Sequence, residues 1–426
     1  MTYRLLCAGV LALLTALPVF AENWPQWRGP KNDGHSSEKG LPSKWAAEEN
    51  VIWKAPLPGP GASTPAIWGD KLFLTAQEGE NLVLICIGTD GKEKWKRPVG
   101  AGVGKYRGDE GNMASASCTT DGKRVYAFVG SGTVGAYEPD TGKPIWEFNV
   151  QDKYGKFQIQ FGAHWTPVLH KDRLYLMVIH RGARFLLALD AATGVPLWKV
   201  ERKSDSPPGV ESPDVYASPF IWEGANGAAL LIAHGDDYCT AHKLEDGSEV
   251  WRVVGLNPKD KYNRAWRGVS SPLVTADLIV VPSCKNGVTV GVKPDGAKGE
   301  IAPGNSAELW RLPKGTPDVP SPVRVGDIVY IMRENGLLMA HEATTGKLIY
   351  EEKVTNERHR ANPVVADGKL YLVGREGTMP VVKAGKEFDL VAKNKLPDTF
   401  TSSPAISNGR IYLRGWNYLW AIGEKK

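Results

Sequence analysis

The side chains best suited to molecular recognition in this 426-residue chain are arginines and tryptophans that fall outside its regular pattern. A guanidinium group is planar and grips carboxylates with two hydrogen bonds, and an indole ring is a flat apolar anchor. We expect one surface that binds an anionic ligand or a segment of a partner protein. The expected ligand or partner face comprises Arg107, His164, Trp165, Arg181, Trp266, Arg267, Arg333, Arg360, Arg375, Arg414 and Trp416.

The same residues allow a simpler interpretation, in which they are only solvated. Loops are polar because they contact water, and sequence neighbours such as Arg333 and Glu334, or Arg375 and Glu376, can neutralise each other. The sequence leaves this alternative open for each single residue.

No catalytic residue and no metal site are expected. The chain lacks Gly-x-Ser-x-Gly, His-Glu-x-x-His and Cys-x-x-Cys-His. Three histidines, His164, His180 and His234, would supply metal ligands if the fold brought them together, but their spacing matches no short ligand motif.

The first 21 residues have the layout of a secretory signal. Arg4 precedes an apolar run from Leu5 to Leu17, and the segment ends in small residues at Ala21. The run is too short to span a membrane. We therefore expect an exported chain, periplasmic or extracellular, that begins near Glu22, has no transmembrane segment and is a monomer.

Charge and cysteine content exclude two further classes of protein, nucleic-acid-binding proteins and disulfide scaffolds. A net charge of +5 is too weak to indicate nucleic-acid binding. Four of the five cysteines follow the expected signal, too few for a disulfide scaffold. Each lies in a strand-like run, which favours buried thiols, although pairing stays open; they are Cys86, Cys118, Cys239 and Cys284.

The 15 tryptophans, 47 glycines and 30 prolines are arranged in repeats. One repeated phrase is a small or hydroxyl residue, a proline, a turn and an apolar strand, with cysteine in place of proline in one copy. Its eight copies contain Pro65, Cys118, Pro167, Pro219, Pro272, Pro322, Pro363 and Pro404.

A second phrase places an aromatic residue after a glycine turn, as in Asp140-Thr141-Gly142 before Trp146. Tyr350 takes the aromatic position in the sixth copy. The residues at this position are expected to pack one repeat against the next rather than to bind a ligand. They are Trp53, Trp95, Trp146, Trp198, Trp251 and Trp310.

Four short strands per repeat, at spacings of about 40 to 55 residues, are typical of β-propeller blades. The eighth copy ends after three strands, and residues 51–54 form a strand that has no preceding partners. We therefore predict an all-β, eight-bladed propeller over residues 51–423, in which the N-terminal strand completes the last blade. Residues 22–50 form an N-terminal strap.

The same strand order sorts the loops by side of the ring. Loops between blades, and loops between the second and third strands of a blade, open on one side, and they are irregular and rich in charged and aromatic residues. The expected ligand or partner face lies in these loops, around the central funnel.

The repeat resembles the quinoprotein-like eight-bladed propellers, whose blades dock through a small residue, a Thr-Gly or Asp-Gly turn and a tryptophan. The matching residues include Ala136, Gly142 and Trp146, and Ala188, Thr193, Gly194 and Trp198. The size and export signal look most like the non-catalytic outer-membrane assembly factor B branch. The opening Trp24 to Pro30 resembles the start of secreted quinone-binding-like repeat proteins.

The resemblance implies a binding or scaffold propeller without a cofactor, and it leaves one alternative. Catalytic members are dehydrogenases that use pyrroloquinoline quinone (PQQ), with adjacent cysteines stacked on the quinone and carboxylates holding calcium. This chain has no adjacent cysteines and no large insertions. Asp109, Glu110, Asp236 and Asp237 would have to supply the carboxylates, and nothing in the sequence brings them together.

Overall fold

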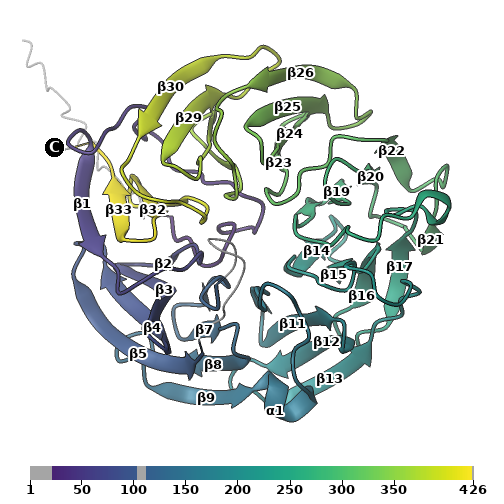
Figure 1. The fold of residues 1–426 in the computed structure, drawn as a ribbon, viewed down its shortest axis with the longest axis horizontal. Coiled ribbons are helices and arrows are strands. Elements are labelled where there is room, and N and C mark those ends of the chain that lie inside the picture. Colours follow the sequence, from purple (N-terminus) through teal and green to yellow (C-terminus); the bar gives the residue numbers. More distant parts are fainter. Residues whose placement is uncertain (1–21, 103–111, 425–426) are drawn as a thin grey trace, which may run out of the picture.

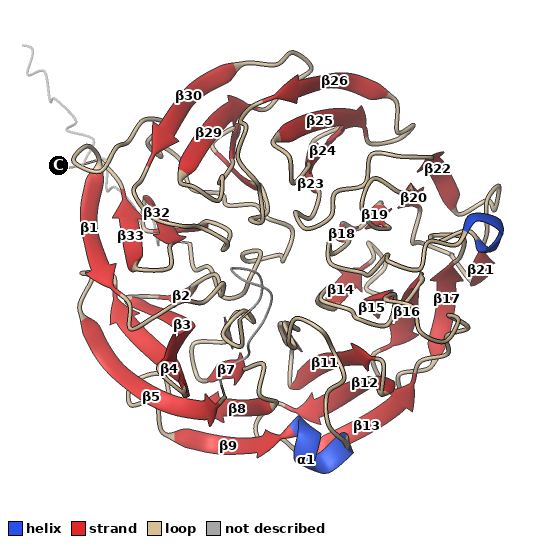
Figure 2. Ribbon diagram, in the orientation of Figure 1, coloured by secondary structure: helices blue, strands red, loops and turns tan. Residues whose placement is uncertain are grey.

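The computed structural model describes residues 22–102 and 112–424. These residues form eight blades arranged around a central axis (Figure 1). Each blade has four antiparallel strands, and the sheet of blade 4 gains a fifth strand from a neighbouring turn. Strands account for nearly all of the regular structure (Figure 2). The predicted all-β, eight-bladed propeller is confirmed.

The first four blades follow one another along the chain, and the strands of each blade run in chain order from the axis outward. Their strands are β2 (Ala66–Trp68), β3 (Lys71–Glu78), β4 (Asn81–Gly88) and β5 (Glu93–Ala101) in blade 1; β6 (Thr119–Thr120), β7 (Val125–Phe128), β8 (Thr133–Tyr137) and β9 (Pro144–Asn149) in blade 2; β10 (Val168–His170), β11 (Arg173–His180), β12 (Ala183–Asp190) and β13 (Pro196–Glu201) in blade 3; and β14 (Phe220–Glu223), β15 (Ala229–Gly235), β16 (Tyr238–Lys243) and β17 (Glu249–Val253) in blade 4.

The other four blades complete the circle. Their strands are β18 (Leu273–Val274), β19 (Ile279–Pro282), β20 (Thr289–Val292) and β22 (Glu308–Leu312) in blade 5; β23 (Val323–Val325), β24 (Ile328–Met332), β25 (Leu337–Glu342) and β26 (Leu348–Lys353) in blade 6; β27 (Val364–Ala366), β28 (Lys369–Tyr371), β29 (Thr378–Lys383) and β30 (Leu390–Lys395) in blade 7; and β31 (Ala405–Ser407), β32 (Arg410–Arg414), β33 (Tyr418–Ile422) and β1 (Val51–Pro56) in blade 8.

Position within a blade explains the composition of each strand. Every residue of β4 after Asn81 is buried, because both faces of this strand pack against neighbouring blades. The outer strand β13 instead alternates between half-buried and exposed residues.

Helix is confined to α1 (Val150–Tyr154) and the 3-10 turn η1 (Lys259–Lys261) among the described residues. No helix in the described part of the chain is both long enough and apolar enough to span a membrane.

The two ends of the propeller are joined in blade 8, as predicted. Strand β1 pairs antiparallel with β33, with Val51 opposite Ile422 and Trp53 opposite Ala421. This pairing supplies the fourth strand of a blade whose other three strands come from the C-terminal end of the chain. It also removes the open edge that β33 would otherwise present.

Tryptophans on the outer strands contact the next blade through a hydrogen bond and a glycine turn. In five cases the indole Nε1 donates to a backbone carbonyl of the following blade, and the ring lies over the glycine of that blade's last turn. The pairs are Trp53 with Thr89 (2.9 Å), Trp95 with Pro139 (2.9 Å), Trp146 with Ala191 (3.0 Å), Trp198 with Leu244 (3.0 Å) and Trp310 with Ala343 (2.8 Å).

Trp251 departs from this arrangement. It is buried, but its Nε1 has no hydrogen-bond partner among the described residues. The turn of blade 5 is stretched, and part of it forms β21 (Gly299–Ile301), which pairs in parallel with β17 as a fifth strand of blade 4. A strand therefore takes the place of the glycine turn, so Trp251 lacks the carbonyl that the other tryptophans bind.

A closed ring of hydrogen bonds, called here the inner ring, links all eight blades near the axis. Each member is the residue before the repeat proline, or before Cys118 in blade 2, and all eight are buried. The backbone N–H of each member donates to the side-chain oxygen of the equivalent residue in the next blade. The sequence of donors and acceptors is Thr64 to Ser117 (2.9 Å), Ser117 to Thr166 (3.1 Å), Thr166 to Ser218 (3.0 Å), Ser218 to Ser271 (3.1 Å), Ser271 to Ser321 (3.0 Å), Ser321 to Asn362 (2.6 Å), Asn362 to Ser403 (3.0 Å) and Ser403 to Thr64 (3.2 Å).

The N-terminal strap crosses the ring from blade 1 to blade 7. Trp24 exchanges backbone hydrogen bonds with Ile67 of β2, and the buried Arg28 donates to the carbonyl of Pro322, just before β23. Farther along the strap, His35 forms a parallel bridge with Val365 of β27. The N–H of Thr120 in β6 of blade 2 also donates to the Pro25 carbonyl (2.8 Å), so between Pro25 and Arg28 the strap passes from blade 2 to blade 6, on opposite sides of the axis.

The contact between Trp146 and Gly194 leads to a first prediction. Gly194 has a φ of 71°, and a Cβ there would lie 2.5 Å from the Trp146 ring. Gly368 is a matched control, with a φ of 68° and no atom within 4 Å. Gly368→Ala should cost about 1 kcal/mol of unfolding free energy from backbone strain, and Gly194→Ala about 2 kcal/mol more from overpacking. Denaturant unfolding of both variants would measure this; equal losses would contradict the docking role of Trp146.

The inner ring leads to a second prediction. Ser271→Ala removes the acceptor of the Ser218 N–H and leaves a buried donor unpaired, which costs about 1–3 kcal/mol. Ser271→Thr should retain most of the stability, because Thr64 and Thr166 accept the same bond in other blades. Thermal unfolding separates the two variants; an unchanged melting temperature for Ser271→Ala would show that the bond contributes nothing.

Candidate functional site

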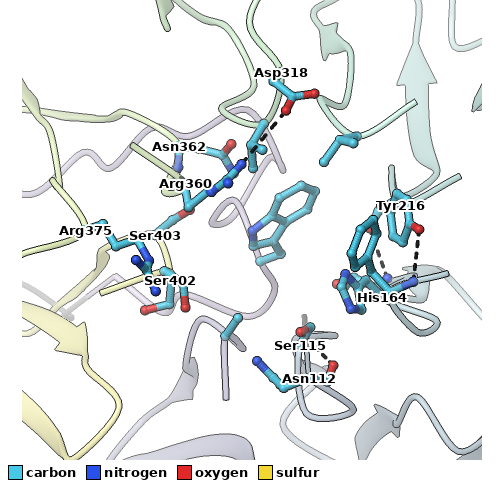
Figure 3. Close-up of a pocket in the computed structure, with 18 of the residues that line it drawn as sticks. Asn112, Ser115, His164, Tyr216, Asp318, Arg360, Asn362, Arg375, Ser402 and Ser403 are labelled. Carbon is cyan, nitrogen blue, oxygen red and sulfur yellow. Dashed lines mark hydrogen bonds and ion pairs between the residues drawn. The ribbon is translucent and has the colours of Figure 1, made fainter. Parts of the chain in front are cut away.

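A cavity of about 200 Å³ lies at the axis of the propeller (Figure 3). Its wall comes from loops between blades, such as Tyr216 and Arg360, and from loops between the second and third strands, such as Arg375 and Trp416. Trp27 of the strap also lines it. The two kinds of loop therefore meet at one site, and the strap lines the side of the cavity that faces away from these loops.

One half of the cavity is lined by cations and a single acidic residue. The guanidinium of Arg360 faces the Asp318 carboxylate at 4.0 Å (Figure 3). Burial raises the pKa of Asp318, and the nearby cations Lys285, Arg267 and Arg360 oppose that shift only in part. The Arg375 guanidinium lies over the Trp416 ring, 5.7 Å from its centre.

The opposite half is aromatic. The His164 and Tyr216 rings lie 5.4 Å apart, and the N–H of Phe161 donates to the Tyr216 hydroxyl (3.2 Å). Burial lowers the pKa of His164 to about 4, so its imidazole is neutral at pH 7 and adds no positive charge. Arg267 lies over Phe161 and pairs with Glu211 at 2.6 Å.

Two carboxylates hold the loops that carry Arg375 and Trp416. Glu357 accepts hydrogen bonds from the N–H groups of Glu376 (2.9 Å), in the β28–β29 loop, and Thr378 (3.2 Å), the first residue of β29. Asp398 does the same for the β32–β33 loop, where it accepts from the N–H groups of Asn417 (3.2 Å) and Tyr418 (3.0 Å). Both loops are therefore fixed from the interblade segment that precedes them.

Five of the residues predicted for the ligand or partner face line the cavity. They are His164, Arg267, Arg360, Arg375 and Trp416. They come from blades that are far apart in the sequence, and the propeller brings them to one place. Arg107 lies outside the described residues.

Arg414 does not lie on the predicted face. Its side chain is buried between blades 8 and 1, where Nη2 donates to the Thr75 carbonyl at 3.2 Å. Gly61 makes this possible, because a Cβ there would lie 2.1 Å from the guanidinium. Burial lowers the pKa of Arg414 to about 9. The group packs between blades and does not reach a ligand.

Trp165 and Arg181 also differ from the prediction. Trp165 is buried and donates to the Val215 carbonyl at 2.7 Å, so it belongs to the packing between blades 3 and 4. Arg181 pairs at 2.7 Å with Asp214, whose side chain is fully buried. That ion pair neutralises Arg181, which is not a lining residue of the cavity.

Arg333 and Trp266 are not lining residues of the cavity. Trp266 instead lines a second, much smaller cavity of about 20 Å³, together with His234, Asp236 and Asp237. That volume suits one water molecule and excludes an organic ligand.

The residues that sequence reasoning missed at the site come from two sources. Trp27 lies in the strap. The segment from Trp24 to Pro30 resembled the start of other secreted repeat proteins, but it gave no sign that Trp27 would line a cavity. Asp318 lies before a repeat proline, in a loop that carries no aromatic signal. Members of the inner ring also reach the cavity; they are Thr166, Ser218, Asn362 and Ser403. A hydroxyl or amide before each repeat proline was the signal that could have identified them.

The donor set does not suit calcium with a bound quinone. Calcium takes six to eight oxygen ligands, several of them carboxylates, whereas Asp318 is the one carboxylate among the described lining residues. No three His, Cys, Asp or Glu side chains of the described part gather as a metal site. Asp109 and Glu110 lie outside the described residues.

The cysteines offer no support for a stacked quinone either. The four in the described part are buried free thiols: Cys86, Cys118, Cys239 and Cys284. Burial raises the pKa of Cys284, the one beside the small cavity, to about 12. These thiols are therefore structural groups.

Curated relatives share most of this chain. The outer membrane protein assembly factor BamB of Yersinia pestis is 24% identical over 322 residues, which cover 74% of this chain and 74% of the relative. The BamB of Moranella endobia (strain PCIT) is 20% identical over 355 residues, covering 83% and 82%.

Solved structures show the same fold. BamB from Moraxella catarrhalis has a TM-score of 0.61 at 13% identity and covers 88% of this chain and 97% of its own. A europium-containing methanol dehydrogenase has a TM-score of 0.69 at 12% identity, with coverages of 94% and 89%. At these identities the likeness concerns the fold alone.

A model of a protein family matches most of this chain. The model described as outer membrane protein assembly factor BamB matches residues 39–214, 130–302 and 297–386, which together extend over most of the propeller. The chain therefore belongs to the outer membrane protein assembly factor BamB family of PQQ-like repeat β-propellers.

Proposed function

We propose that this protein is an exported, non-catalytic binding or scaffold propeller that acts in the assembly of other proteins. The observation that carries the proposal is the axial cavity, where three arginines, Arg267, Arg360 and Arg375, converge with aromatic rings. A binding site of this kind suits carboxylates, either of a partner segment or of an anionic ligand.

Charge supports an anionic occupant. The cavity wall carries the guanidinium groups of Arg267, Arg360 and Arg375. Glu211 pairs with Arg267 (2.6 Å) and Asp318 faces Arg360 (4.0 Å), whereas Arg375 lies over the Trp416 ring and His164 is neutral. Low local dielectric strengthens the attraction of such groups for a carboxylate. Arg375 is held over Trp416, so the guanidinium needs little ordering when it binds.

Rigid geometry supports a preformed site. Glu357 and Asp398 hold two of the loops, and members of the inner ring such as Ser403 form part of the wall. The site thus rests on hydrogen-bonded loops and on the inner ring, and a partner would meet a surface that is already shaped.

Relatives point to the same class of function. The curated relatives are named as outer membrane protein assembly factors, which makes a scaffold role the natural extension to this chain. Under this proposal the expected signal at residues 1–21 exports the chain, and the partner is a protein rather than a nucleic acid.

The alternative is a PQQ-dependent dehydrogenase with calcium in the funnel. Its support is the fold likeness to a methanol dehydrogenase. The described residues do not fit the calcium–quinone pair, because they offer one carboxylate at the cavity and no adjacent cysteines. Binding is therefore the preferred function.

A charge reversal tests the proposed site. A fluorescein-labelled hexaglutamate peptide serves as the probe, and fluorescence anisotropy gives its dissociation constant. Arg375→Glu should weaken binding by about tenfold or more, because it replaces an attraction with a repulsion at the cavity. Lys123→Glu is the matched control, since this exposed lysine lies in the β6–β7 turn, on the strap side of the ring.

The outcomes separate the hypotheses. Equal weakening by Arg375→Glu and Lys123→Glu would mean that the peptide senses only net charge, and the cavity would lose its role. Thermal unfolding with PQQ and calcium supplies the second readout, because a ligand at 100 times its dissociation constant adds about 2.7 kcal/mol. A calcium-dependent rise in the melting temperature would favour the dehydrogenase.

A further inference from the structure

The backbone nitrogen of Glu22 is bound to a carboxylate. It lies 3.0 Å from Oε1 of Glu38, and the same oxygen accepts the N–H of Asn408 at 3.0 Å. The other oxygen of Glu38 accepts the N–H of Gly409 at 2.8 Å. Glu38 therefore connects the first described residue to the β31–β32 turn of blade 8. We call Glu22, Glu38 and this turn the N-terminal anchor.

The remaining polar groups of Glu22 are also bound. Its carboxylate accepts from the Ser36 hydroxyl (2.6 Å) and the Ser37 N–H (2.8 Å), and its carbonyl accepts from the Ser407 hydroxyl (2.6 Å). Chain ends are usually poorly ordered unless something holds them. The hydrogen bonds to its nitrogen, carboxylate and carbonyl therefore hold Glu22 in place.

We propose that cleavage between Ala21 and Glu22 during export creates an α-ammonium group that pairs with Glu38 and fixes the strap. The cleavage site follows from the secretory signal expected at residues 1–21. The proposal concerns maturation of the chain and holds whether or not the axial cavity binds a partner.

The cleavage is a hydrolysis by an export-associated signal endopeptidase. Water adds its hydroxyl group to the Ala21 carbonyl carbon and a hydrogen to the Glu22 nitrogen as the peptide bond breaks. The free amine then takes one more proton, because an α-amino group has a pKa of about 7.7–8.0. The nitrogen changes from a neutral amide with one hydrogen into a cation with three.

The new charge lies beside a carboxylate. Glu38 lies at the nitrogen, and the carboxylate of Glu22 itself binds the nearby strap residues Ser36 and Ser37. The amide N–H of Glu22 already donates to a carboxylate, and the ammonium group adds a Coulomb attraction between opposite charges to that hydrogen bond. Cleavage thus strengthens an existing contact, and no rearrangement of the anchor is required.

The anchor acts on the same segment that lines the axial cavity. The strap runs from Glu22 through Trp24, which pairs with β2, to Trp27 in the cavity wall. An end that is held at blade 8 restricts opening of the whole strap, including Trp27. Removal of the signal would therefore also consolidate that part of the wall.

The cleavage site is tested first, on the protein recovered after export. Intact mass and N-terminal sequencing should show a chain that begins at Glu22. A chain that begins at any other residue would overturn the proposal, since its ammonium group would lie away from Glu38.

The ion pair is tested with two purified chains, one beginning at Glu22 and one at Ala21. Trypsin cutting after the exposed Lys31 and Lys39 reports opening of the strap. The Ala21 chain should be cut several-fold faster and melt on the order of 2 °C lower. Equal cutting rates and equal melting temperatures would overturn the proposal.

Carboxylate variants identify the partner of the ammonium. In a Glu38→Gln background the two chains should be cut at equal rates, because the charge on residue 38 is gone. Glu48→Gln is the control, an exposed strap carboxylate, and should preserve the several-fold difference. A difference that survives in Glu38→Gln would assign the effect to chain length alone. Nα-acetylation of the Glu22 chain repeats the test without changing a side chain.

Discussion

The inner ring is the constraint on which the rest of the molecule depends. A blade cannot shift along the axis or rotate without stretching the bond to the next blade, and the eight bonds close on themselves between Ser403 and Thr64. Each bond needs a short side-chain acceptor, which explains serine, threonine and asparagine before the repeat prolines. The proline that follows has no N–H of its own and keeps the preceding residue extended.

Two circles of contact then fix the blades, and the site lies where the inner circle meets the loops. Toward the perimeter, tryptophan rings such as Trp146 pack over glycine turns. Near the axis, the residues of the inner ring form part of the cavity wall. The charged and aromatic groups of the cavity therefore come from loops that differ from blade to blade, whereas its shape comes from the repeat.

The repeat made the fold predictable, because every copy carries the same spacing signal. The closing strand at Val51 could be predicted since one blade was a strand short. Arg375 and Trp416 could also be placed, because strand order assigns their loops to one side of the ring. Five predicted face residues do meet at one cavity.

What the sequence could not show is the direction of individual side chains. Arg414 ends a strand like a face residue, but Gly61 in another blade leaves room for it to turn inward. Arg181 depends on Asp214, a carboxylate more than thirty residues away. Trp27 reaches the cavity only because the strap crosses the axis, which no local pattern encodes.

Strand β21 shows where this architecture tolerates additional chain. The stretched turn of blade 5 leaves the sheet, pairs with β17 and returns to β22, while Ser271 and Ser321 keep their places in the inner ring. Among the docking tryptophans, Trp251 is the one whose Nε1 has no hydrogen-bond partner in the described part of the chain. The last turn of a blade is thus a permissive insertion point, where a peptide tag or a second module could be grafted on the perimeter while the ring stays closed.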